Sequence, residues 1–441
     1  MLKKLFQYMT LGRKEPGQQA VIIPRDQHTV SRRDISNAAL KVMRQLNDHG
    51  FEAYLVGGGV RDLLLGGRPK DFDVATNATP EQVRSLFRGA RIIGRRFKIV
   101  HVRFGREMIE VTTSRGHHEA HRSEHGMVLR DNHYGSVQTD AMRRDFTVNA
   151  LYYTLKGFEL HDYTGGMQDL QHRRLRIIGD PETRYKEDPV RMLRAARFAA
   201  KLGFELEEET ARPIRELAPL LGNIPPARLF EEVLKLFLGG SATATFRLLR
   251  EYHLLGCLFP GPEAILTSGD EVALALMEQC MCNTDLRVRG GKTVTPAFIF
   301  AAFLWPVQQA RERDLAQRMP VGQAYHEAAT QVVREQLGHT SIPKRFLLPM
   351  REIWDLQRRL TQRSGQRPYR LLEHPRFRAA YDFTLLREEA GESLDGLGNW
   401  WTAFQAGDEQ ERERLIAKVK GDGKPRRGRR RGGQRSQSAN G

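Results

Sequence analysis

GGGVRDLLLGGRPKDFDVAT, residues 57–76, is the stretch of this 441-residue chain that decides its fold. It follows AYLV at 53–56, a short apolar segment that predicts a buried strand, and VRDLLLG then predicts a short helix. Glycines between a strand and a helix let backbone N–H groups approach a phosphate, and the start of a helix favours an anion. For the glycines taken alone, a tight turn without a ligand is the alternative interpretation.

Two aspartates follow the glycines, Asp71 and Asp73 in DFDVAT. This segment predicts a strand, and because alternate strand residues point to one face about 6.6 Å apart, the two carboxylates are expected to converge. Converging carboxylates favour divalent metal, and two ions about 3.5–4 Å apart can hold the attacking and leaving oxygens of a phosphoryl transfer. Without the glycines, Asp71 would be interpreted as a turn residue and Asp73 as an exposed strand position.

A third carboxylate is expected from a hairpin. KIVHVRF at 98–104 and EMIEVTT at 107–113 predict two strands that turn at Gly105 and Arg106. Glu110 lies in the second strand, which can pair beside DFDVAT. The alternative is an ordinary solvent-facing glutamate of a hairpin.

Charge and composition limit the kinds of partner and the location that the chain can have. The 70 basic and 53 acidic residues give a net charge of +17, which favours a polyanion such as RNA, although a solvated basic surface is the alternative. No apolar run approaches the roughly 18 residues of a membrane span, and the first 14 residues argue against a secretory signal. Cys257, Cys280 and Cys282 cannot form a disulfide framework, which favours a cytoplasmic location.

The patterning predicts an α+β chain of five parts. We expect a flexible arm at 1–34, a mixed α/β head at 35–180, helical regions at 181–250 and 251–410, and a disordered basic tail at 411–441. Apolar stripes at helical spacing predict the helices, as in PPARLFEEVLKLFLGG and FRAAYDFTLLREEAG. The end of the chain, GDGKPRRGRRRGGQRSQSANG, has too few apolar residues to fold alone.

Two further stretches carry candidate ligands. GHHEAHRSEHG contains His117, His118, His121 and His125, but it is polar, lies in a predicted loop and lacks cysteine, so we do not expect zinc there.

In EDPVRMLRAARFAAKLGF at 187–204, Asp188 before Pro189 predicts a helix start with the aspartate as N-cap. Arg191 and Arg194 would then share one flank of that helix, where guanidinium groups can match a base edge or a phosphate. A solvated charged face is the alternative.

Three stretches together resemble the motifs of the class II nucleotidyltransferases, the family of bacterial poly(A) polymerases and CCA-adding tRNA nucleotidyltransferases. They are the glycine and aspartate stretch, RRDFTVNALYY at 143–153 and the stretch at 187–204, in the order of the family. The resemblance implies that the head is a polymerase-beta-like nucleotidyltransferase domain. It also implies that 181–250 forms a neck for nucleotide recognition and RNA binding.

The resemblance assigns a role to each matching residue. Asp71 and Asp73 would bind the metal, with Glu110 as the third acid. The surroundings of the triphosphate and the metal would consist of Gly57, Gly58, Arg61 and Asp62. The sugar and the phosphates would be contacted by Arg144, Asp145 and Asn149, with the catalytic Asp145 at the ribose. Asp188 and Arg191 would recognise the base. Arg194 and Arg197 would point toward the phosphate.

Other segments resemble the poly(A) polymerase branch, among them GRRFKIVHVRFG, IPKRFLLPMREIWDLQRRL and the arginine-rich tail. This implies template-independent transfer of AMP from ATP to RNA 3′ ends with two Mg²⁺ ions and release of pyrophosphate. It also implies a role in RNA decay, with an RNA chaperone or a helicase as partners. A CCA-adding tRNA nucleotidyltransferase is the alternative, and a noncatalytic RNA-binding protein is the second alternative.

Overall fold

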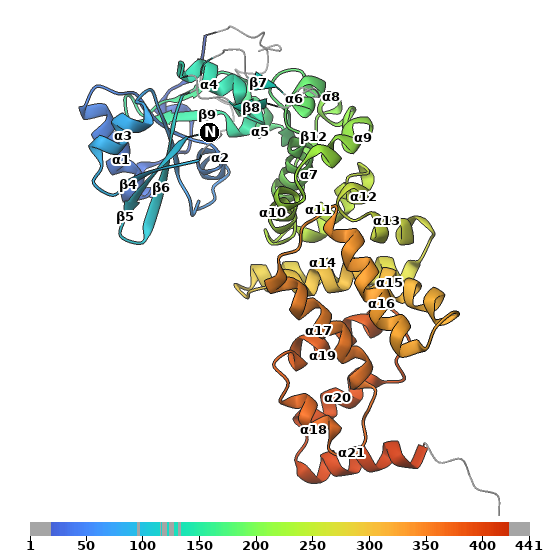
Figure 1. The fold of residues 1–441 in the computed structure, drawn as a ribbon. Helices are drawn as coiled ribbons and strands as arrows, with labels where there is room; N and C mark the ends of the chain where they lie inside the picture. The colour runs from blue at the N-terminus through green and yellow to red at the C-terminus, as the bar shows by residue number, and fades with distance from the viewer. Residues whose placement is uncertain are drawn as a thin grey trace, which may run out of the picture. The chain divides into compact units, whose positions relative to one another are not determined.

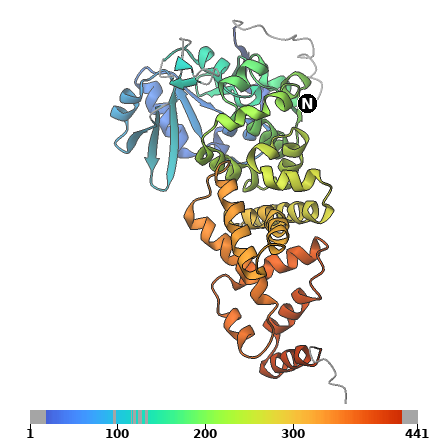
Figure 2. The same cartoon turned by 45° about the vertical axis from the view of Figure 1, so that its right-hand side comes forward.

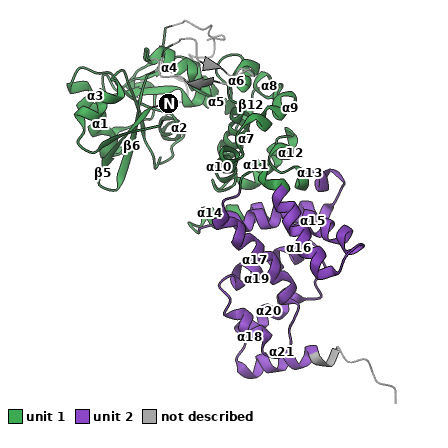
Figure 3. Cartoon of the chain, in the orientation of Figure 1, with its two compact units in different colours: residues 1–263, 284–292, 335–341 green, residues 264–283, 293–334, 342–441 purple. Residues whose placement is uncertain are grey.

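The computed structural model describes residues 19–94, 98–114, 116, 121–122, 128–130 and 134–422. The chain divides into two compact units, shown in Figure 3. Unit 1 consists of residues 1–263, 284–292 and 335–341, and unit 2 consists of residues 264–283, 293–334 and 342–441.

The head of unit 1 is built on an eight-stranded mixed sheet, seen from two directions in Figures 1 and 2. In spatial order the strands are β1 (Val21–Ile23), β10 (Leu160–Asp162), β9 (Leu151–Thr154), β2 (Ala53–Val56), β3 (Asp73–Thr76), β6 (Glu107–Thr113), β5 (Ile99–Phe104) and β4 (Ala90–Ile93). Neighbours in this sheet are antiparallel except β3 and β6, which are parallel. Two short sheets pair β11 (Arg174–Leu175) with β12 (Glu205–Leu206) and β7 (His121–Arg122) with β8 (Val128–Arg130).

Helices complete unit 1. Those of the head are α1 (Asn37–Asp48), α2 (Gly58–Leu64), α3 (Pro80–Leu86), α4 (Val137–Arg143) and α5 (Gly166–Gln171), with the 3-10 helix η4 (Thr147–Asn149). Those that follow are α6 (Pro181–Glu187), α7 (Val190–Leu202), α8 (Glu208–Ala211), α9 (Ile214–Leu217), α10 (Pro226–Phe237), α11 (Ala242–Glu251) and α12 (Leu255–Leu258).

The two faces of the large sheet have different cores. One core contains residues of α1 and α3, and the other contains residues of α4. Since strand side chains alternate between faces, Val74 joins the first core and Ala75 the second. Asp73 lies two residues before Ala75, so its side chain points to the face that α4 covers.

The structure confirms the predicted head and corrects one detail of it. The strand at 53–56 is present, and β5 and β6 form the predicted hairpin around Gly105, whose φ is +59°. However, β3 begins at Asp73, so Asp71 precedes the strand and is exposed. The prediction that both aspartates occupy alternate positions of one strand is therefore wrong.

Part of the expected N-terminal arm belongs to the head. Strand β1 pairs with β10, Val30 is fully buried, and the ring Nε2 of His28 donates to the carbonyl oxygen of Phe158 at 2.9 Å. The prediction of a flexible arm is wrong for this part, because sheet pairing and apolar burial fix it. Residues 1–18 lie outside the described residues.

Unit 2 is helical, as predicted. Its complete helices are α15 (Pro296–Ala316), α17 (Lys344–Leu360), α18 (Arg367–Leu372), α19 (Phe377–Glu389), α20 (Leu397–Ala406) and α21 (Glu409–Asp422). Three helices have residues in both units: α13 (Pro260–Thr267), α14 (Glu271–Arg289) and α16 (Val321–Leu337). One core of unit 2 gathers around the buried Trp401 and Phe404.

The last described helix changes one expected boundary. Because α21 extends to Asp422, residues 411–422 are helical, where we expected a disordered tail. The rest of the expected tail, 423–441, lies outside the described residues. Within the described part of the chain, no helix is both long and apolar enough to cross a membrane.

Candidate active site

The glycine turn between β2 and α2 lies against both aspartates. Gly57 has φ +80°, and a Cβ placed there would be 3.3 Å from Oδ2 of Asp73. A Cβ on Gly59 would be 3.3 Å from the carbonyl oxygen of Asp71. Gly57 also has ψ −149°, a backbone conformation that is accessible essentially to glycine alone. Because glycine has no Cβ, the turn leaves space beside the Asp73 carboxylate.

Asp73 is the centre of an acidic group formed with Asp71 and Glu110. In the parallel pairing of β3 with β6, Asp73 stands opposite Glu110. Burial, followed by the charge of Glu110, raises the pKa of Asp73 to about 6; Arg144 acts against the rise and Asp71 adds to it. Among the described residues, no three His, Cys, Asp or Glu side chains already form a metal-binding group. The acidic group is therefore an electrostatic neighbourhood, with Asp73 as its most buried member.

A chain of hydrogen bonds connects five of the other predicted residues. Arg61 is buried and donates from Nε to Asp62 at 2.8 Å and from Nη1 to Asn149 at 2.7 Å. Asn149 in turn donates to Oδ1 of Asp145 at 3.1 Å. Arg194, from α7, closes the chain by donating from Nε to Oδ2 of Asp145 at 2.8 Å. The network joins α2, η4 and α7 within unit 1.

Asp145 is saturated by these donors. Its Oδ1 accepts from Asn149 and from the N–H of Phe146, and its Oδ2 accepts from both Nε and Nη2 of Arg194. Four donors fill the roughly four lone-pair positions of a carboxylate, so contact with a ribose would require one donor to leave. Burial alone would raise the pKa of Asp145, but the Arg194 ion pair and the hydrogen bonds hold it well below its usual range.

Three predicted arginines surround one ring. The guanidinium carbons of Arg61, Arg194 and Arg197 lie 5.3, 5.1 and 4.5 Å from the centre of the Phe198 ring. Burial, followed by the charge of Arg194, lowers the pKa of Arg197. Its Nε is buried and has no hydrogen-bond partner among the described residues.

The two residues predicted to read the base have different hydrogen-bond partners in this structure. Asp188 accepts from Nη2 of Arg228 at 3.0 and 2.9 Å, whereas Arg191 donates to Glu187 at 3.0 Å. Helix α7 begins at Val190 and has no side-chain cap. The prediction of Asp188 as N-cap is therefore wrong, because its carboxylate is committed to Arg228.

Four residues that support the site were not singled out in the sequence. Arg184 donates from Nη2 to the backbone carbonyl oxygens of Arg143 and Arg144, both at 2.7 Å. The others are Arg228, Asp140 and Tyr152. Tyr152 lies inside one of the quoted stretches, but Arg228 is 40 residues from Asp188 and no local pattern reveals it.

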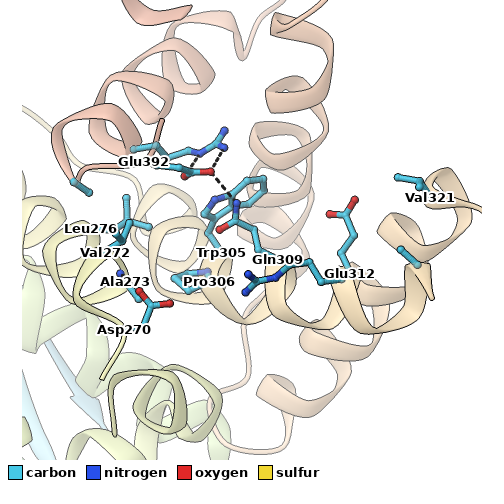
Figure 4. A pocket seen from close by; sticks show the side chains of 14 residues that line it. Asp270, Val272, Ala273, Leu276, Trp305, Pro306, Gln309, Glu312, Val321 and Glu392 are labelled. Atoms are coloured by element: carbon cyan, nitrogen blue, oxygen red, sulfur yellow. Dashed lines mark hydrogen bonds and ion pairs between the residues drawn. The ribbon is translucent and has the colours of Figure 1, made fainter. Parts of the chain in front are cut away.

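Two other regions contain candidate ligands or a pocket. The predicted histidine cluster falls on residues whose positions or side chains lie outside the described part of the chain. A pocket of about 520 Å³ lies in unit 2, and Figure 4 shows Trp305 and Pro306 in its lining. Its Glu392 is already paired with Arg387 at 2.6 Å. None of the predicted site residues lines this pocket.

Together, the mixed sheet, the glycine turn and the acidic group beside it define the chain as a nucleotidyltransferase. Comparison with known families agrees. Residues 53–176 match the Poly A polymerase head domain, 203–266 the probable RNA and SrmB-binding site of polymerase A, and 317–435 the polymerase A arginine-rich C-terminus.

Individual relatives identify the family. Poly(A) polymerase I of Salmonella typhimurium is 51% identical over 421 residues, which cover 92% of this chain and 90% of that protein. The chain therefore belongs to the poly(A) polymerase family. A CCA-adding enzyme of Lactobacillus helveticus is 39% identical, covering 50% of this chain and 55% of its own. The solved CCA-adding enzyme of Bacillus stearothermophilus in complex with CTP has a TM-score of 0.55 at 28% identity, covering 86% and 82% of the two chains.

Proposed function

We propose that this chain transfers AMP from ATP to the 3′ ends of RNA without a template and releases pyrophosphate. The observation that carries the proposal is the 51% identity to a poly(A) polymerase over 92% of the chain. This match includes the head and the helical regions that follow it. The groups in the head are those that nucleotidyl transfer requires.

The chemistry of the acidic group fits a divalent cation. Mg²⁺ prefers oxygen ligands, and Asp71, Asp73 and Glu110 offer carboxylates. A positive charge would also relieve the repulsion that contributes to the raised pKa of Asp73. We therefore assign the metal to Asp71 and Asp73, with Glu110 beside them. When bound there, a pair of magnesium ions would neutralise the triphosphate and favour ionisation of the attacking hydroxyl.

In the proposed reaction, the 3′-oxygen of RNA attacks the α-phosphorus of ATP. A new phosphorus–oxygen bond forms, the bond to the β-phosphate breaks, and the hydroxyl proton is lost to solvent. Arg144 and Arg197 would contact phosphate, Asp145 the ribose, and Asp188 with Arg191 the base. The remaining members of the network, Arg61, Asp62, Asn149 and Arg194, would hold these groups in place.

The proposed polymer partner is RNA. The net charge of +17 supports a polyanion, and the match of residues 203–266 to a probable RNA and SrmB-binding site supports RNA as that polyanion. We also propose that the chain has a role in RNA decay and that an RNA chaperone or a helicase is its partner. A cytoplasmic location is also a proposal, supported by three cysteines that form no disulfide.

A CCA-adding tRNA nucleotidyltransferase is the second candidate. It is favoured by the 39% identity to a CCA-adding enzyme, although that match covers only 50% of this chain. The two candidates differ in the nucleotide that they accept and in where they stop.

One experiment separates these functions. The full chain is given ATP, CTP, GTP or UTP separately with Mg²⁺, on a generic RNA and on a tRNA that lacks its 3′ end, and the products are sized. Long tails from ATP alone on both RNAs are expected. Incorporation of CTP that stops after a few residues on the tRNA would instead identify a CCA-adding enzyme, and no incorporation would favour a noncatalytic RNA-binding protein.

A further inference from the structure

Arg144 is held at one nitrogen by two side chains outside the predicted site. Its Nε donates to the hydroxyl of Tyr152 at 2.8 Å and to Oδ2 of Asp140 at 3.2 Å. The Tyr152 hydroxyl donates in turn to the same oxygen of Asp140 at 2.7 Å. The three side chains therefore form a closed triangle of hydrogen bonds.

The other end of the Arg144 side chain faces the glycine turn. A Cβ on Gly57 would be 3.8 Å from Nη1 of Arg144 and 3.3 Å from Oδ2 of Asp73. Because the triangle uses Nε, it does not consume the terminal nitrogens.

Both residues that hold Arg144 are firmly fixed. Tyr152 is fully buried in β9, and its ring packs edge-on against Tyr54 and Tyr163, with ring centres 6.0 and 5.9 Å apart. Asp140 is 7% exposed and lies on α4. Burial raises the pKa of Tyr152 well above its usual value, so its hydroxyl keeps the proton that it donates to Asp140. Such buried polar groups require partners, and each finds one in the triangle.

We infer that Asp140 and Tyr152 are positioning residues that keep the terminal nitrogens of Arg144 available for the triphosphate of ATP. The inference deepens the proposed function and rests on it, because it takes ATP as the substrate. A loose arginine would have to be ordered when ATP binds, which weakens binding. It could also turn onto Asp73 and form an ion pair that competes with the metal. The triangle prevents both.

The test uses Tyr152→Phe in the full chain, with Tyr153→Phe as the matched control. Both changes remove one hydroxyl from a buried tyrosine of β9, but Tyr153 faces the core under α1. At saturating RNA we expect kcat/KM for ATP to fall about tenfold in Tyr152→Phe, the effect of one charge-assisted hydrogen bond, and less than about twofold in the control. Thermal unfolding of each variant is measured in parallel.

Coupling to Arg144 separates positioning from a general structural effect. In an Arg144→Lys background, Tyr152→Phe should cost less than about twofold, because the group that it positions is gone. Asp140→Asn, which keeps the shape of the side chain, gives the same test independently if Tyr152→Phe fails to fold. An equal loss from Tyr152→Phe in both backgrounds, or equal activity of the two tyrosine variants, would overturn the inference while leaving the proposed function intact. Absence of AMP incorporation by the unmodified chain would overturn both.

Discussion

Asp73 and Asp145 are two partly buried carboxylates of unit 1 that have opposite electrostatic surroundings. Asp73 has two acidic neighbours, and burial together with Glu110 raises its pKa to about 6. Asp145 is paired with Arg194, and its pKa is held well below the usual range. The first carboxylate is left with unbalanced negative charge, whereas the second is balanced within the protein.

The difference suggests which part of the site is built for a ligand. Unbalanced like charges destabilise a folded protein, so their presence at the glycine turn points to a cation that is to be bound there. A balanced pair instead orders its surroundings, as the network from Arg61 to Arg194 does.

The largest effect is expected at the unbalanced carboxylate. Asp73→Asn should lower AMP incorporation by at least about a thousandfold, because metal-assisted charge stabilisation contributes several kcal/mol. RNA binding should be retained. Incorporation is followed on gels and RNA affinity by filter binding. Turnover within tenfold of the unmodified chain would contradict the metal assignment.

A change at the balanced pair should affect folding as well as chemistry. Arg194→Gln leaves the Asp145 carboxylate without its ionic partner, and the side chain of Arg194 is 32% exposed. We expect a loss of about 2 kcal/mol in the free energy of unfolding, between the small loss from an exposed pair and the larger loss from breaking a fully buried one. Urea unfolding measures it, with Arg378→Gln as control, since that arginine is 74% exposed in its ion pair with Asp382. Equal stability of the two variants would show that the Asp145 pair is not a structural element.

The pKa of Asp73 predicts a pH dependence of metal affinity. A protonated carboxyl does not bind a cation, so the apparent affinity for Mg²⁺ should fall as the pH drops through about 6. At pH 5 the loss should be about tenfold, and above pH 7 the affinity should level off. Mg²⁺ titrations of the full chain at several pH values provide the measurement. A profile that stays flat down to pH 4.5 would mean that Asp73 keeps an ordinary pKa.

The smallest effect is expected at the more exposed neighbour. Glu110 is 42% exposed and lies 3.9 Å from the ring Nε2 of His101. Because its charge helps to raise the pKa of Asp73, Glu110→Gln should lower that pKa by less than about one unit in the absence of metal. Carboxyl NMR of labelled aspartate can follow the titration. A rise of the pKa in the variant would reverse the sign on which the comparison rests.

Local patterns predicted much of the fold. The strand at 53–56, the glycine turn, the hairpin around Gly105 and the helical nature of unit 2 all depend on residues close in sequence. The boundaries of the head and of the N-terminal arm were less predictable. Strand β1 pairs with β10, about 140 residues away by the register of Ile23 with Leu160, and no pattern in the arm announces this partner.

The candidate site was also predictable only in part. The types of its residues follow from the motifs, and the structure brings Asp73, Gly57 and Arg144 together as the motifs imply. Their partners could not be predicted. Asp145 with Arg194 and Asp188 with Arg228 are pairs separated by 49 and 40 residues.

By itself, the sequence determined the class of the head, the glycines that approach phosphate and the carboxylates that attract metal, because these properties belong to residue types and to short-range backbone geometry. Only the tertiary structure decided which carboxylates are balanced and which are not. The parallel pairing of β3 with β6 sets Glu110 beside Asp73, while the packing of α7 brings Arg194 to Asp145. The charge around a buried group depends on all its neighbours in space, and sequence separation does not limit which residues those are.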